Sequence, residues 1–225
     1  MTEEQIQKHI ENLGEDGFTV FHNEFSKDEC KTFVEKCEAI TEEQMKTGKM
    51  DPEGDCQYLW NFFNHDWDLM PLVHNENADA VLKRVLDNDY TLTAANIINR
   101  YKKDDTKDAS EYGDNWHTDS RYLGGQRLCA GFCFSLIIML NDFTADNGAT
   151  HYVRGSQKSR LRPDRQGDYE HEIMEGEAGT MVIFDSGLWH KGGPSSTKKR
   201  WGVFNMYGPW FMKPYFRFPE MIDKN

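Results

Sequence analysis

Apolar residues recur at the spacing of an α-helix in three segments of the first ninety residues, namely 3–13, 26–45 and 77–86. The first segment runs into Gly14, a residue type that commonly ends a helix. The second opens with Ser26 and, three residues later, Glu29, which is the spacing of a capping box at a helix N-terminus. The sequence therefore predicts a helix-rich first third.

Segments in which apolar residues alternate with polar ones, or run together, predict strands at 17–22, 90–101, 130–140, 149–153, 169–174, 179–185 and 200–207. Segment 130–140 is nearly unbroken in its apolar character, which is typical of a strand buried on both faces rather than an edge strand. Asp146-Asn147-Gly148 is a strong turn signal before 149–153. Many short strands after an α-rich beginning indicate a mainly β fold with flanking helices, in which a jelly roll carries helices on one sheet.

We expect residues 1–225 to form one domain, since this length suffices to bury a real core. Within it, we expect 1–89 to pack on the sheet, 90–207 to form the jelly-roll core and 208–225 to form a C-terminal cap. Aromatic residues are dense at 57–74 and in the tail, and packing is favoured over ligand contact for the first of these segments.

Two charged loops have alternative interpretations. Residues 102–115 form either a lid beside the site or a plain solvated connection. Residues 158–168 are basic, with Lys158, Arg160, Arg162 and Arg165. A solvated loop is favoured there over a site that draws anionic substrates.

Charge and cysteine content narrow the possible partners and location. The formal net charge of −12 argues against a nucleic-acid partner, because binding to phosphates needs a basic face. We expect no membrane span and no secretory signal, since the chain has no long apolar run and its first twenty residues are acidic. Five cysteines without a disulfide spacing fit a reducing cytoplasm, and Cys129 and Cys133 are interpreted as small core residues. We expect a monomer or a homodimer that binds a small molecule.

Two histidines and one aspartate form the most informative pattern. His117 and Asp119 are two residues apart and would point to one face of an extended strand, and His190 follows some seventy residues later. Two imidazoles and one carboxylate are the ligands of the facial triad that holds Fe(II) and leaves positions open. Arg200 would add a fixed, permanently charged fork for a carboxylate. The ordered set points to an iron oxygenase that uses 2-oxoglutarate.

The sequence around these residues resembles the phytanoyl-CoA dioxygenase family in the segments 116–119, 141–149, 153–158, 179–185, 189–190 and 200. The similarity extends from about residue 17 to about residue 207. It implies a double-stranded β-helix that uses Fe(II), 2-oxoglutarate and O2. The family usually has Pro-Gly-Ser-His where this chain has Arg154-Gly155-Ser156-Gln157, a difference that affects local loop structure only.

The resemblance implies hydroxylation of a small-molecule metabolite, with release of succinate and CO2. Halogenating relatives replace the carboxylate ligand by a small residue, whereas this chain retains Asp119. Arg200 would pair with the C5 carboxylate of 2-oxoglutarate. Many relatives have a serine two residues after the distal histidine to assist this arginine, and here that position is Gly192, so another donor must help or the pocket is looser.

Four further residues are candidates for contact with small molecules. By position, Asn99 and Ser135 match polar residues that contact 2-oxoglutarate in some relatives, although Ser135 fits equally well as a small hydroxyl in a buried strand. Arg121 and Tyr122 follow the triad and are candidates for the substrate. Arg121 would suit a carboxylate, phosphate or sulfate, or would pair with a surface aspartate.

Two other functions compete with the small-molecule hydroxylase. The same ligands can hold Zn or Mn in a non-catalytic jelly-roll protein, but such a protein has no need of the carboxylate clamp that Arg200 offers. An oxygenase that acts on a protein side chain is the third hypothesis, and no peptide groove is marked in the sequence.

Overall fold

A computed structural model describes residues 1–50, 56–100, 115–120, 131–194 and 199–215. Arg121, Tyr122, Cys129 and nearly all of the charged loop at 102–115 lie outside the described residues. The helices are α1 (Glu3–Glu15), α2 (Lys27–Lys46) and α3 (Glu76–Leu86), with 3-10 turns η1 (Phe62–Asn64), η2 (Trp67–Leu72) and η4 (Ser156–Ser159). The three predicted helices are confirmed. None of the helices in the described residues has the length and apolar character needed to span a membrane.

Side-chain hydrogen bonds cap the N-termini of the first two helices. Thr2 caps α1 and Ser26 caps α2, each in a complete capping box with the residue three positions on. The prediction that Gly14 ends the first helix is wrong, because α1 continues to Glu15. The backbone turns only at Gly17, whose φ of 89° suits glycine.

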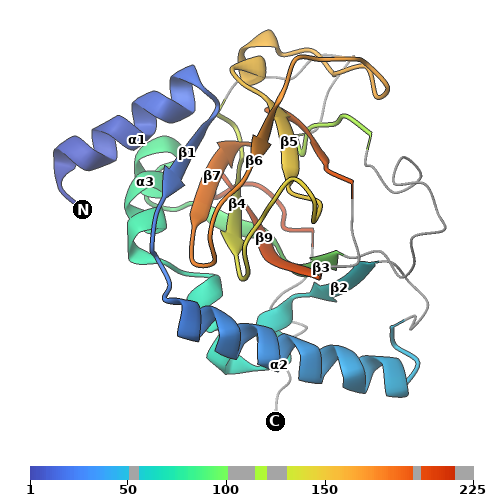
Figure 1. The fold of residues 1–225 in the computed structure, drawn as a ribbon. Helices are drawn as coiled ribbons and strands as arrows, with labels where there is room; N and C mark the ends of the chain where they lie inside the picture. Colours follow the sequence, from blue (N-terminus) through green and yellow to red (C-terminus); the bar gives the residue numbers. More distant parts are fainter. Residues whose placement is uncertain (51–55, 101–114, 121–130, 195–198, 216–225) are drawn as a thin grey trace.

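The strands form two antiparallel sheets, as expected for a jelly roll (Figure 1). The larger sheet has the order β1-β7-β4-β9-β3-β2, and the smaller has the order β6-β5-β8. The strand bounds are β1 (Phe18–Phe21), β2 (Cys56–Trp60), β3 (Thr91–Arg100), β4 (Phe134–Met139), β5 (Thr150–Val153), β6 (Glu172–Met174), β7 (Met181–Asp185), β8 (Trp189–Gly192) and β9 (Arg200–Gly208). Strand β4 is buried along its whole length between β7 and β9, which confirms that 130–140 contains an interior strand.

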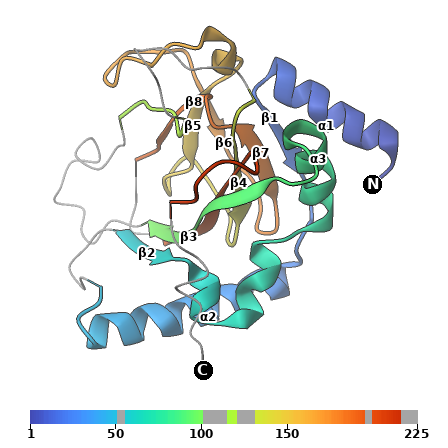
Figure 2. The same cartoon turned by 180° about the vertical axis from the view of Figure 1, so that it is seen from behind.

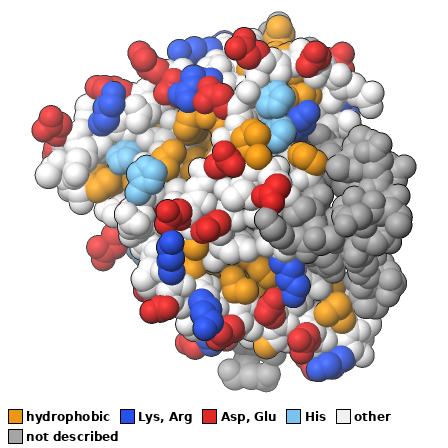
Figure 3. Space-filling model, viewed as in Figure 1, with side chains coloured by type: hydrophobic (Ala, Val, Ile, Leu, Met, Phe, Trp, Pro, Cys, Tyr) orange, Lys and Arg blue, Asp and Glu red, His pale blue; other side chains and the backbone are white. Residues whose placement is uncertain are grey.

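Two apolar layers result from alternation along the interior strands. On β4, Leu136 and Ile138 belong to the core that the larger sheet forms with the helices, whereas Ile137 and Met139 belong to the core around the smaller sheet. Figures 1 and 2 show α1, α2 and α3 flanking the larger sheet. The helix-rich first third thus packs on one sheet and leaves the space between the sheets for the site. On the face shown in Figure 3, acidic and basic side chains are interspersed.

In the described part of the C-terminal tail, up to residue 215, several aromatic side chains are exposed rather than buried as in the expected hydrophobic cap. Trp210, Phe211 and Tyr215 remain 67%, 61% and 46% exposed. The chain does return to the sheet, since the backbone N–H of Tyr215 donates to the Thr93 carbonyl at 2.8 Å.

The aromatic segment 57–74 divides between core and surface. Phe62 and Phe63 are buried, as predicted, but Trp67 is 61% exposed. Strand β2 alternates, so that Tyr58 and Trp60 are 41% and 49% exposed and their rings stack at 5.3 Å. Core packing is therefore the correct interpretation for only part of the segment.

Gly179 should be among the least replaceable residues of the fold. Its φ is 88°, its N–H donates to the Met139 carbonyl at 2.8 Å, and an added Cβ would collide with the carbonyl oxygen of Phe25. We expect Gly179→Ala to lower the free energy of unfolding by roughly 3 kcal/mol or more, since it combines left-handed strain with a backbone clash.

Urea denaturation would measure this loss, with Gly14→Ala as the matched control. Gly14 is exposed within α1, and an added Cβ would meet nothing within 4 Å. Alanine there should raise stability by roughly 0.5–1 kcal/mol. Equal effects at the two glycines would contradict the role assigned to Gly179.

Candidate metal centre

His117 and His190 lie side by side at the open edge of β8. Each backbone N–H donates to the other residue's carbonyl, at 2.9 and 3.0 Å, and the ring centroids are 4.3 Å apart. This single bridge replaces the extended strand predicted for 117–119, and the segment around it is otherwise bent. Asp119 still reaches the same point, and the ligand atoms of the three residues lie within 4.8 Å of one another.

The backbone sets which nitrogen of each imidazole faces the site. The Nδ1 of His117 is 2.8 Å from the Asn115 carbonyl, and the Nδ1 of His190 is 2.9 Å from the Leu188 carbonyl. A carbonyl can only accept, so each Nδ1 carries the proton and each Nε2 presents a lone pair. The two Nε2 atoms lie 3.9 and 3.5 Å from Oδ1 of Asp119. Neutral imidazoles oriented in this way are suited to bind a metal ion.

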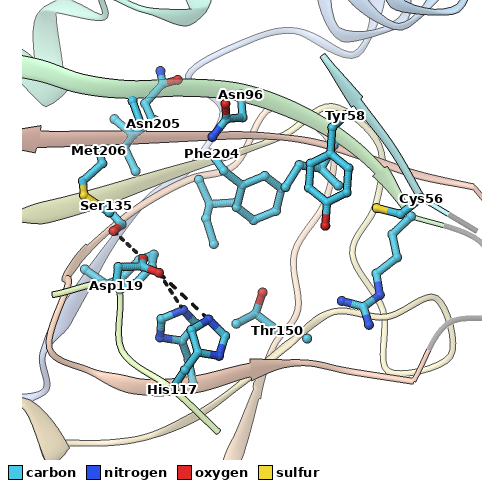
Figure 4. A pocket seen from close by; sticks show the side chains of 18 of the residues that line it. Cys56, Tyr58, Asn96, His117, Asp119, Ser135, Thr150, Phe204, Asn205 and Met206 are labelled. Atoms are coloured by element: carbon cyan, nitrogen blue, oxygen red, sulfur yellow. Dashed lines mark hydrogen bonds and ion pairs between the residues drawn. The ribbon is translucent and has the colours of Figure 1, made fainter. Parts of the chain in front are cut away.

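A hydrogen bond from a neighbouring strand orients the Asp119 carboxylate. The Ser135 hydroxyl on β4 donates to Oδ2 at 2.7 Å, which leaves Oδ1 toward the histidines (Figure 4). Burial by itself would raise the pKa of Asp119, but the charge that His190 and His117 carry when protonated, with hydrogen bonds from His190 and Ser135, lowers it to about 2. Asp119 is therefore an ionised, oriented carboxylate, and together with the two histidines it forms a group that could hold a metal ion.

A cavity of about 270 Å³ extends from these three side chains to Arg200. Arg200 begins β9, is only 3% exposed, donates to the Gly148 carbonyl and lies 4.6 Å over the Phe143 ring. The structure thus places the metal-binding residues and the predicted carboxylate clamp in one cavity, although they come from distant parts of the sequence.

Of the two polar residues proposed by position, only Ser135 lines this cavity. The assignment of Asn99 to co-substrate contact is wrong, because Asn99 points to the opposite face of β3 and donates to Gln57 at 2.9 Å. Alternation along β3 instead directs Asn96 and Arg100 into the cavity. No hydrogen-bond partner of the Asn96 side-chain oxygen is found among the described residues.

Sequence reasoning also missed Tyr58 and Thr150. Both side chains line the cavity, and Figure 4 shows Tyr58 across the cavity from Asp119 and Thr150 beside His117. Thr150 pairs directly with Gly192 across β5 and β8. Its hydroxyl therefore lies on the same face as the side chain that Gly192 lacks. The alternation of β2 and the register of β5 would have revealed these residues only once the sheet pairing was known.

The sequence profile of the phytanoyl-CoA dioxygenase (PhyH) family matches residues 13–202. The chain belongs to this family. The "Uncharacterized protein Rv1501" of Mycobacterium tuberculosis and its Mycobacterium bovis counterpart Mb1539 are each 34% identical over 76 residues. These matches cover 32% of this chain and only 28% of either relative.

Solved structures share the phytanoyl-CoA dioxygenase fold along most of the chain. AviO1 of Streptomyces viridochromogenes superposes with a TM-score of 0.69 at 19% identity, over 95% of this chain and 99% of that one. HygX of Streptomyces hygroscopicus, with nickel and 2-oxoglutarate bound, gives 0.73 at 15% identity over 96% and 90%. The epimerase SnoN, in complex with Fe3+, alpha ketoglutarate and nogalamycin RO, gives 0.68 at 12% identity over 92% and 85%. These likenesses establish the shared fold.

Proposed function

We propose that this protein is an Fe(II)- and 2-oxoglutarate-dependent oxygenase that hydroxylates a small molecule. The observation that carries the proposal is the single cavity in which His117, Asp119 and His190 stand at one end and Arg200 at the other. A metal-binding barrel without co-substrate would have no use for a buried guanidinium at that place. HygX and SnoN, which share the fold, are known with 2-oxoglutarate or alpha ketoglutarate bound.

The cavity supplies a contact for each end of the co-substrate. His117, Asp119 and His190 would hold the iron, with positions left for the carboxylate and keto oxygens at one end of 2-oxoglutarate and for O2. Arg200 would bind the other carboxylate, assisted by the hydroxyl of Thr150.

Two arginines stand at the clamp end. Arg100 pairs directly with Arg200 across β3 and β9, and both line the cavity. Like charges directly opposite each other on neighbouring strands repel. Both guanidinium groups could contact one carboxylate of a dicarboxylate co-substrate, whereas a neutral ligand would gain no charge interaction from them.

When bound, iron, 2-oxoglutarate and O2 supply an oxidant at the cost of decarboxylating 2-oxoglutarate to succinate and CO2. The protein's own residues orient the reactants. Ser135 fixes Asp119, the carbonyls of Asn115 and Leu188 fix the imidazoles, and the apolar walls from Ile137, Phe184 and Phe204 limit water. Retention of the Asp119 carboxylate leaves no halide position and favours hydroxylation over halogenation.

The test is whether the purified protein, given Fe(II), O2 and 2-oxoglutarate, forms succinate. We expect slow formation without a prime substrate and faster formation with one, together with a product that contains one more oxygen atom. Zn(II) in place of Fe(II) should give no succinate, since zinc has no redox chemistry. Stoichiometric metal binding without succinate under any condition would instead support the non-catalytic alternative. Accelerated succinate formation with a product of unchanged mass would indicate another oxidation, such as the epimerisation for which SnoN is named.

A further inference from the structure

A second cavity, of about 500 Å³, shares His117 and Asp119 with the first. His117 and Asp119 form one wall, and Arg162 and Arg165 from the loop after η4 form another. Its volume suits a small-molecule ligand. It contacts the metal-binding residues without including Arg200, so it is separate from the co-substrate end of the first cavity.

The loop that carries these arginines is fixed to the metal centre. The residue before each histidine ligand is a tryptophan, and both tryptophans contact the loop. The backbone N–H of Trp116 donates to the Arg165 carbonyl at 3.0 Å, and the indole N–H of Trp189 donates to the Leu161 carbonyl at 2.9 Å. Tyr169 packs between them, with ring centroids 5.5 Å from Trp116 and 5.0 Å from Trp189. The loop, which runs over the end of the smaller sheet at the top of Figure 1, is therefore positioned by the same residues that precede the metal ligands.

The charges on the cavity wall oppose the charge of the whole protein. The chain has a net charge of −12, yet Asp119 is the sole carboxylate among the described residues that line this cavity, beside two arginines. Asp119 would be neutralised by a bound metal ion. The loop also contains Lys158 and Arg160, which do not line the cavity. A pair of arginines on the wall is suited to bind carboxylate or phosphate oxygens.

We infer that the prime substrate carries an anionic group, either a carboxylate or a phosphate, which Arg162 and Arg165 bind while the rest of the molecule faces the metal. This inference rests on the proposed function, because it names the substrate class of the same centre. It replaces the interpretation of 158–168 as a purely solvated loop. It also predicts that affinity for the anion falls as ionic strength rises, since both arginines are exposed.

The test uses protein loaded with Mn(II) and N-oxalylglycine, an unreactive analogue of 2-oxoglutarate. Benzoate, phenyl phosphate and the neutral benzyl alcohol are then titrated by calorimetry. At least one anion should bind the wild type about ten-fold or more tighter than benzyl alcohol. Benzoate and phenyl phosphate distinguish a carboxylate from a phosphate substrate.

Four variants locate the anion site. Arg162→Gln and Arg165→Gln should each weaken the preferred anion about ten-fold, with benzyl alcohol unaffected. The double Lys variant, which keeps the charge, should retain most of the affinity, and this rescue separates a charge contact from misfolding. Arg160→Gln is the matched control, because it removes the same charge from the same loop but away from the cavity. It should bind every probe as the wild type does.

The outcomes separate the two proposals. If the wild type fails to bind Mn(II) and N-oxalylglycine in the first place, the proposed function is wrong. If it loads normally but prefers neither anion to benzyl alcohol, or if Arg162→Gln and Arg165→Gln match Arg160→Gln, the anionic substrate is excluded and the oxygenase assignment stands.

Discussion

Replacement of Arg200 by alanine should weaken 2-oxoglutarate binding about thirty-fold to a thousand-fold while metal content stays unchanged. Arg200 is only 3% exposed, and the direction of its guanidinium is fixed by the Gly148 carbonyl and by the Phe143 ring. A carboxylate bound there would gain charge-assisted hydrogen bonds in a site that excludes water. The metal-binding residues lie at the other end of the cavity, so the metal content of the variant should equal that of the wild type.

Arg200→Lys and Thr150→Val give the graded comparison. Lysine keeps the charge but lacks the planar guanidinium. Arg200→Lys should therefore weaken 2-oxoglutarate binding by about thirty-fold at most. Valine at position 150 keeps the shape of threonine but removes the hydroxyl opposite Gly192. Thr150→Val should therefore weaken 2-oxoglutarate binding about five-fold to ten-fold. The measurement is a 2-oxoglutarate titration of the Mn(II) form. Wild-type affinity in Arg200→Ala would place the clamp elsewhere and remove the main support for a dicarboxylate co-substrate.

The residues that the structure brings together at the candidate metal centre were visible in the sequence, because ligand chemistry restricts residue type. His117, Asp119, His190 and Arg200 stand in a fixed order, and that order is visible without any knowledge of strand pairing. The helices were predictable for a similar reason, since capping and periodicity are local properties.

Residues whose role depends on register were predicted less well. Sequence position favours Asn99, whereas Asn96 faces the cavity, a difference of three positions that reverses the face of the strand. Thr150 enters the site through its pairing with Gly192. The placement of Arg162 and Arg165 depends on tertiary contacts between a long loop and two tryptophans, and no local pattern encodes these contacts.

His117→Ala should abolish both iron binding and succinate formation. Loss of one of three protein ligands leaves two, and His117 contributes a lone pair whose direction the Asn115 carbonyl fixes. The side chain of His117 is 44% exposed, against 9% for His190, so truncation at position 117 should disturb packing less. This makes His117 the better site for the test. Iron content per chain and succinate yield would be measured on the same preparation.

Two further variants serve as comparisons for His117→Ala. Ser135→Ala removes the hydrogen bond to Asp119 but no ligand, and should weaken metal binding about ten-fold to a hundred-fold rather than abolish it. His151→Ala is the matched histidine control: His151 lies on β5, stacks on His171 at 4.8 Å and does not belong to the metal-binding group. Its iron content should equal that of the wild type. Stoichiometric iron and full turnover in His117→Ala would refute the assignment of the metal centre, whereas equal losses in His117→Ala and His151→Ala would show that the effect is a general loss of structure.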